Sequence, residues 1–157
     1  MKRSMCLWIG VLASTLPVSV RGQGLRWPAH SLWQVNTAES NYPGKEYDKA
    51  DRVEIVSDTD KSLTFTDHNV DQHGAPVTRT WKGPQDGTMK PYGDDGSMAG
   101  FRWDHGVHKS DWKMSDGSSM SCTFQMSSNG KKTTETCDVK QPDGKTRTDT
   151  IVYNRVK

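Results

Sequence analysis

Two cysteines are the residues of this 157-residue chain whose spacing points most directly to chemistry. Cys122 and Cys137 flank Asn129-Gly130, a dipeptide typical of tight β-hairpin turns. A two-residue turn there opposes Ser128 to Lys131 and, by the same register, Cys122 to Cys137. The spacing therefore predicts a disulfide between neighbouring strands. In this register the pair falls at a hydrogen-bonded site, where we expect some strain or a bulge.

The same register sets Glu135 opposite Phe124. If that strand face is the interior, Glu135 is a carboxylate among apolar side chains. It then needs Arg79, Arg147 or a ligand as its partner, because an isolated buried charge is costly. The alternative is a hydrated position near the mouth of the fold. In the first case Glu135 is a candidate ligand-binding residue. In a reaction at the mouth of the fold, Glu135 or His108 is the candidate base.

Two clusters of histidine and aspartate offer side chains of the kind that bind zinc or copper. One is Asp104-His105-Gly106-Val107-His108, and the other contains Asp67, His68, Asp71 and His73. Both fall at expected turns, where exposed polar residues occur without any metal, so we assign no metal ligand and no cofactor. The sequence has no G-x-S-x-G, H-E-x-x-H or paired C-x-x-C motif, and we assign no catalytic residue.

The elements that would position these groups are strands separated by glycine turns. A glycine preceded by Asn, Asp or His recurs every 9 to 14 residues, at Gly74, Gly87, Gly96, Gly106, Gly117, Gly130 and Gly144. The segments between them alternate polar and apolar residues, as half-buried strands do. The pattern predicts an all-β fold: a single antiparallel up-and-down meander of about 8–10 strands that closes into a barrel.

Aromatic and methionine side chains dominate the expected interior. From residue 23 on, Ile, Leu, Val and Phe number only 17 in 135 positions, while five tryptophans supply large apolar area. We predict that the interior is lined by Trp81, Trp103, Trp112, Phe124 and Met126. Such a barrel either fills with side chains or holds one small ligand, and the sequence leaves both outcomes open.

The first 22 residues have the pattern of an export signal. Positive residues at Met1-Lys2-Arg3 precede an apolar run from Cys6 to Leu16 that is too short to span a bilayer, and Val20-Arg21-Gly22 fits cleavage after Gly22. We predict a signal peptide at 1–22, a loose N-terminal arm at 23–31 and a β-barrel domain at 32–157. The alternative for the first segment is an uncleaved anchor.

The charge of the remaining chain excludes some partners. Without the leader it carries 18 basic and 19 acidic residues and no basic stripe, so nucleic acid is not an expected partner. No later segment is apolar enough to span a membrane. An exported chain with two cysteines is expected in the periplasm or outside the cell, where a disulfide persists.

Five short motifs spread over most of the mature chain form a recognisable set. They are Leu32-Trp33-Gln34-Val35-Asn36 with Glu39-Ser40-Asn41-Tyr42, Gly74 in a D-x-x-G turn, Trp81, Asp86-Gly87 before Lys90-Pro91-Tyr92-Gly93, and Asp143-Gly144-Lys145-Thr146. Together they resemble small secreted bacterial lipocalin-like proteins, a largely uncharacterised family. The chain departs from that family at Ser31, where a glycine would stand, and in its cysteine pair. The resemblance implies a lipocalin-like barrel and no particular activity.

The sequence thus favours an exported, non-enzymatic binding protein for a small apolar or amphipathic ligand. Its expected contacts are Trp81, Trp103, Trp112, Phe124, Met126 and Glu135. One alternative is an envelope structural or interaction protein with a filled core. Another is a small hydrolase or isomerase that works at the barrel mouth. The interior volume separates the first two readings.

Overall fold

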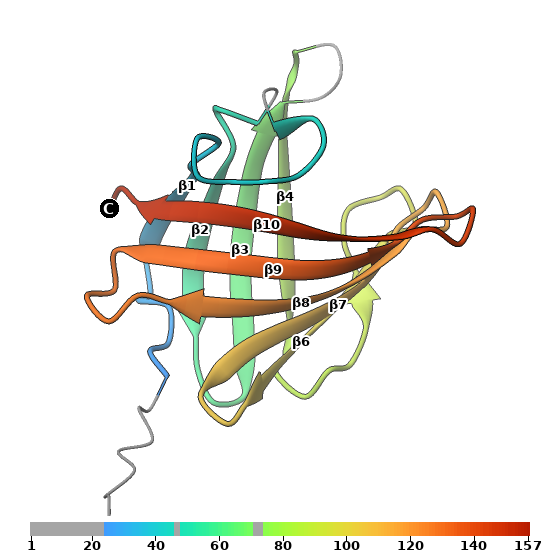
Figure 1. Cartoon of the computed structure of the whole chain (residues 1–157). Coiled ribbons are helices and arrows are strands. Elements are labelled where there is room, and N and C mark those ends of the chain that lie inside the picture. The colour runs from blue at the N-terminus through green and yellow to red at the C-terminus, as the bar shows by residue number, and fades with distance from the viewer. Residues whose placement is uncertain (1–23, 46–47, 71–73) are drawn as a thin grey trace, which may run out of the picture.

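The computed structural model describes residues 24–45, 48–70 and 74–157, which form one antiparallel sheet of ten strands (Figure 1). The strands are β1 (Ser31–Val35), β2 (Arg52–Asp58), β3 (Ser62–Val70), β4 (Pro76–Pro84), β5 (Lys90–Pro91), β6 (Met98–Asp104), β7 (Val107–Lys113), β8 (Ser119–Met126), β9 (Lys132–Lys140) and β10 (Thr146–Arg155). The predicted signal peptide lies outside the described residues, as do Asp71 and His73. Within the described ranges, no helix has the length and apolarity needed to cross a bilayer.

The strand order makes the sheet an up-and-down barrel that is nearly closed. The order is β4-β3-β2-β1-β10-β9-β8-β7-β6-β5, so sequence neighbours are paired throughout and β1 pairs with β10. The two edge strands of the sheet, β4 and β5, approach each other at the connection between them. There the Gly87 N–H donates to the Phe101 carbonyl at 2.8 Å, and Asp86 forms an isolated bridge with Arg102. The predicted fold class is confirmed.

Seven glycines mark the connections between successive strands from β3 to β10, as predicted. All of them, Gly74, Gly87, Gly96, Gly106, Gly117, Gly130 and Gly144, have positive φ. This conformation costs glycine little and other residues more, which explains the residue choice at each reversal.

The β8–β9 hairpin has the predicted register with a wider turn. Cys122 opposes Cys137 and the two are joined in a disulfide. The last backbone bond of the hairpin runs from the Ser127 N–H to the Lys132 carbonyl, so the loop has four residues, not two. This changes which pairs exchange hydrogen bonds. The cysteines therefore occupy a non-hydrogen-bonded pair with a Cα–Cα distance of 4.1 Å, and the expectation of a hydrogen-bonded site was wrong.

The segment between β1 and β2 crosses one end of the barrel (Figure 1). It is attached to β10 at two points. Asn41 exchanges two backbone hydrogen bonds with Thr150, at 2.7 and 2.9 Å, and the Val152 N–H donates to Ser40 Oγ at 2.9 Å. This end of the barrel is thus bordered by a loop.

Aromatic rings fill the part of the interior nearest the β2–β3 turn. Trp81 and Leu63 are fully buried there, and the Trp81 ring lies 4.7 Å from Phe101 and 5.8 Å from Phe65 between centroids. Gly83 makes room for this packing, because a Cβ at that position would come within 2.6 Å of the Trp81 ring. We call the end filled by aromatic rings, near the β2–β3 turn, the closed end. The end bordered by the segment between β1 and β2 is the open end.

The segment before β1 packs into the closed end, which differs from the loose arm expected at 23–31. Trp27 is 8% exposed, stacks on His108 at 4.1 Å and meets the edge of Phe124 at 5.1 Å. Arg26 lies over the Trp103 ring at 4.2 Å. The segment is ordered because a tryptophan can fill the end of the barrel next to these rings.

Asp58, at the end of β2, connects this arm to the barrel. Its buried carboxylate accepts hydrogen bonds from the Trp27 N–H at 2.9 Å, from Arg26 at 3.0 Å, from Gln85 at 2.7 Å and from His108 Nε2 at 2.8 Å. Burial alone would raise the pKa of Asp58, but the bonds from His108, Gln85 and Trp27 outweigh it and hold the pKa below its usual value. Asp58 is therefore an ionised carboxylate with all of its acceptor sites used.

We expect Trp27→Ala to lower the free energy of unfolding by about 3–5 kcal/mol, because it removes a buried indole from the closed end. Urea unfolding of the oxidised protein measures the change. Leu25→Ala is the matched control: Leu25 is 46% exposed, and its loss should change stability by less than about 0.5 kcal/mol. If Trp27→Ala behaves like the control, the arm is not part of the folded unit.

Candidate functional site

A cavity of about 780 Å³ occupies the open part of the barrel interior. Much of its wall is apolar and aromatic, formed by Trp33, Val53, Ile55, Phe65, Trp112 and Phe124. The indole N–H groups of Trp33 and Trp112 are already bonded at 2.8 Å to Ser31 and Ser110, two positions earlier on the same strands. Their rings therefore contribute apolar surface without an unsatisfied donor.

Three tyrosine–carboxylate pairs interrupt this apolar wall. Tyr153 on β10 donates to Glu135 on β9 at 2.9 Å, Tyr92 donates to Asp67 on β3, and Tyr42 donates to Asp48 at 2.7 Å. All six residues line the cavity. Burial and the neighbouring carboxylates raise the pKa of each tyrosine, so all three remain neutral donors.

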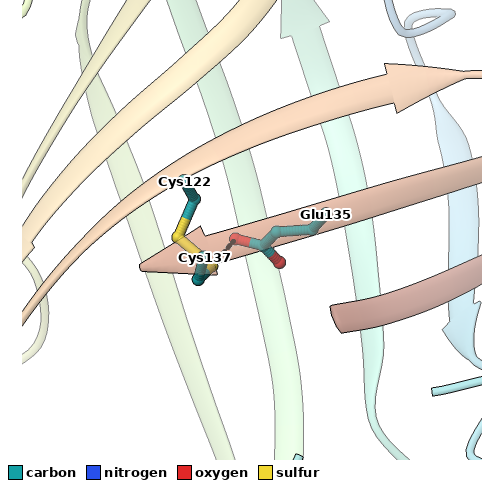
Figure 2. A group of neighbouring side chains, drawn as sticks. All are labelled: Cys122, Glu135 and Cys137. Carbon is teal, nitrogen blue, oxygen red and sulfur yellow. Dashed lines mark hydrogen bonds between the residues drawn. A yellow bond between two sulfur atoms is a disulfide. The ribbon is translucent and has the colours of Figure 1, made fainter. Parts of the chain in front are cut away.

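Glu135 is the most deeply buried of these acids, at 6% exposed. Burial raises its pKa to about 7, the charge of Asp67 adds to the rise, and the bond from Tyr153 opposes it. Its second oxygen, Oε1, lies 3.5 Å from Cys137 Sγ (Figure 2). Because that sulfur belongs to the disulfide, it has no hydrogen to donate, and Oε1 has no donor there.

Asp67 carries the second interior charge, on the wall formed by β3. Burial raises its pKa to about 6, with a contribution from the charge of Asp51, against the bond from Tyr92 and the charge of Arg79. Arg79 faces Asp67 in the β3–β4 register. Among the described residues that line the cavity, Arg79 is the only one with a cationic side chain.

Asp51, at the open end, is a third acid whose pKa is raised. Burial and the charge of Asp48 raise its pKa to about 6, and a backbone hydrogen bond from Val70 opposes the rise. Within the described part of the chain, its buried Oδ1 has no hydrogen-bond partner. Acidic side chains thus become more frequent in the cavity wall toward the loop that borders it.

The structure separates the six ligand contacts predicted from the sequence. Trp112, Phe124 and Glu135 line the cavity. Trp81 is packed in the closed end, Trp103 lies against Arg26 and His108, and Met126 lines a separate cavity of about 200 Å³ next to the arm. All six side chains lie on the inward faces of their strands, but at different heights along the barrel axis.

Sequence reasoning missed much of the polar part of the site. Asp67, which lines the cavity, was grouped with His68 as a turn cluster, although Leu63, Phe65 and Asp67 continue one alternating face of β3. That alternation was the available signal for Asp67. Tyr92, directly after β5, and Tyr153, on β10, become visible only when the barrel brings them beside the acids.

The described members of the two histidine clusters, which exclude Asp71 and His73, do not converge on a metal site. His68 lies near Glu54 at 3.8 Å on the exposed face, and His105 is exposed beside Asp104. His108 is buried, and its Nδ1 has no partner within the described ranges.

Three metal-ligating side chains come together at one place among the described residues. They are Cys122, Glu135 and Cys137, whose candidate ligand atoms lie within 4.8 Å of one another (Figure 2). In this structure the disulfide joins the two sulfurs, so neither is a thiolate.

Comparisons with known proteins identify the fold and no family. No family model matches the chain, and no curated protein matches it. Two solved structures of the fluorescent protein UnaG are similar. The structure of a single-residue mutant has a TM-score of 0.52 at 10% identity, covering 87% of this chain and 97% of the other. The wild-type structure has a TM-score of 0.51 at 12% identity, with 80% and 95% covered. At these identities the likeness shows a shared barrel architecture.

The raised pKa values of Glu135 and Asp67 predict that the protein loses stability as pH rises from about 5 to 8. The unfolded chain releases these protons near pH 4, while the folded protein holds them to about pH 6–7, so ionisation favours unfolding across that window. Urea unfolding at pH 5 and pH 8 measures the loss.

We expect Glu135→Gln to remove about 1–3 kcal/mol of this loss, because the amide is isosteric and does not ionise. Glu54→Gln, on the exposed face of β2, is the control and should leave the difference between the two pH values unchanged. Equal losses in the Glu135→Gln variant and the parent would contradict an interior carboxyl at this site.

Proposed function

We propose that this protein is a non-enzymatic binding protein that holds a small apolar or amphipathic ligand inside its barrel. The observation that carries the proposal is the interior cavity of about 780 Å³, which lies within the range of small-molecule sites. Aromatic walls supply apolar contact, and a few converging polar groups supply orientation. A structural protein with a filled core, the first alternative, does not account for this volume.

A proton-transfer enzyme is the second candidate, and one observation favours it. Glu135 lies in the cavity with a pKa raised to about 7, a value suited to a general acid or base near neutral pH. His108, the other candidate base, is less suited because its Nε2 is bonded to Asp58 and its ring is covered by Trp27. The enzyme reading requires turnover that Glu135→Gln abolishes while leaving ligand binding in place.

We further propose that the chain is exported and acts in the periplasm or outside the cell. The leader-like segment at 1–22 supports this, as does the Cys122–Cys137 disulfide, which persists in oxidising compartments. Cleavage after Gly22 would leave Arg26 and Trp27 a few residues inside the new N-terminus. The contacts of the arm would therefore survive processing.

Nile red, an uncharged apolar dye, tests the cavity. We expect one molecule to bind per chain with a blue-shifted emission, because the dye leaves water for an aromatic site. Val53→Trp fills part of the cavity and should weaken binding by about tenfold. Glu54→Trp adds the same side chain to the exposed face and should leave binding unchanged. The proposal fails if the parent does not bind Nile red, or if both variants bind it as the parent does.

Mass spectrometry of the protein recovered outside the cytoplasm tests the export proposal. We expect the chain to begin at Gln23 with both remaining cysteines oxidised. Gly22→Leu places a large residue at the cleavage position and should leave the leader attached. An intact N-terminus on the parent protein, or its retention in the cytoplasm, would contradict this proposal.

A further inference from the structure

The charges inside the cavity are strongly unbalanced. Among the described lining residues, four are carboxylic acids, Asp48, Asp51, Asp67 and Glu135, and Arg79 is the only cation. The protein supplies hydrogen bonds to the acids mainly from tyrosines, which carry no charge. When the acids ionise, most of their negative charge therefore lacks a counter-charge from the wall.

Glu135 shows this most directly, because it is more than nine-tenths buried and lines the cavity. Tyr153 satisfies Oε2, while Oε1 faces a disulfide sulfur that cannot donate. A buried acceptor without a donor is costly. The N–H of a protonated amine would supply the missing donor, and a quaternary ammonium group would supply a positive charge beside the carboxylate without a hydrogen bond.

The acids also act on one another from different walls of the barrel. Asp67 projects from β3 and Glu135 from β9, which lie on opposite sides of the barrel in Figure 1. The charge of Asp67 nevertheless opposes ionisation of Glu135, and the charge of Asp51 opposes ionisation of Asp67. A positive charge placed among them would favour ionisation of all three.

Aromatic side chains line the same space. Trp33 and Trp112 line the cavity, and their N–H groups are bonded to serines on their own strands. The negative face of an aromatic ring attracts cations, and quaternary ammonium groups in particular. The wall therefore favours a positively charged group on an apolar body.

Arg79 does not provide an open site for an anionic head group. Its guanidinium lies 5.7 Å from the Tyr92 ring, Arg79 is the partner of Asp67 in the β3–β4 register, and its charge lowers the pKa of Asp67. An anionic ligand would compete with Asp67 for this group and would lie among the other carboxylates. Repulsion by like charges in a poorly solvated site disfavours that arrangement.

We propose that the cavity selects cationic amphipathic ligands, amines or quaternary ammonium compounds with an apolar body, whose head group lies between Glu135 and Asp67. This inference rests on the proposed binding function and names the chemical class of its ligand. It assigns the apolar body to the aromatic wall.

Displacement of Nile red at pH 8 by four decyl compounds tests the proposal. Decylamine and decyltrimethylammonium should displace the dye at concentrations at least about tenfold lower than decanol, and decanoate should be the weakest. Equal displacement by decylamine and decanol, or stronger displacement by decanoate, overturns the proposal. If Nile red binds but the amines show no preference, the binding function stands and only this inference fails. If Nile red does not bind, the binding function itself fails.

Variants and pH locate the head group. Glu135→Gln and Asp67→Asn should each weaken decyltrimethylammonium binding by about tenfold and leave decanol binding unchanged, because they remove charge and keep shape. Glu54→Gln is the control and should change neither.

The pH dependence of binding is a second test. Decyltrimethylammonium does not titrate, so its affinity should rise from pH 5 to pH 8 as Asp51, Asp67 and Glu135 ionise. Over the same range Arg79 keeps its charge and the tyrosines remain neutral. A flat pH profile, or no effect of either variant, overturns the proposal.

Discussion

Ten strands enclose more interior than the large side chains of this chain fill, and the rest of the structure follows from that constraint. Barrel volume rises with strand number, and aliphatic residues are scarce in this sequence. Aromatic rings concentrate at one end, around Trp81 and Phe101, where they pack on one another. The other end keeps a cavity: several tryptophans and phenylalanines form part of its wall, and valines, tyrosines and acids complete the wall without filling the space.

Hydrogen-bonded polar side chains, as well as apolar ones, close the filled end of the barrel. Asp58 gathers hydrogen bonds from the arm, from Gln85 and from His108, so three separate segments meet at one carboxylate. Its charge is compensated by Arg26, and the hydrogen bonds from His108, Gln85 and Trp27 hold its pKa low. Glu135 is also buried, but of these two carboxylates only Asp58 has a full set of donors, so only Asp58 serves the fold without a ligand.

Sequence reasoning found the parts of this structure that local patterns control. Glycine turns fix each reversal from β3 to β10, because positive φ favours one residue type. The cysteine register was also predictable, since pairs on two strands keep a constant sum even when the loop between them widens. The β2–β3 turn at Thr59 to Ser62 lacks glycine, so the same rule gave no signal there.

What sequence reasoning missed depends on position along the barrel axis and on contacts between distant segments. Alternation predicts that Trp81 points inward, but it does not say whether the ring enters the filled end or the cavity. The contact between Arg26 and Asp58 joins residues 32 positions apart, through a closure that no local pattern encodes. The predicted loose arm illustrates this limit, because its burial depends on His108 and Phe124 from two later strands.

The interior acids are better explained by binding than by folding. Replacing a buried charge with an apolar residue of similar shape often stabilises a protein, so acids facing a cavity work against stability unless something compensates them. Here the compensation is partial: Tyr92 and Tyr153 each satisfy one oxygen, and neither neutralises charge. A bound cation would complete the set of partners, and by mass action it would stabilise the folded chain. The interior acids that lower the stability of the fold at high pH would then also give the barrel its selectivity for a cation.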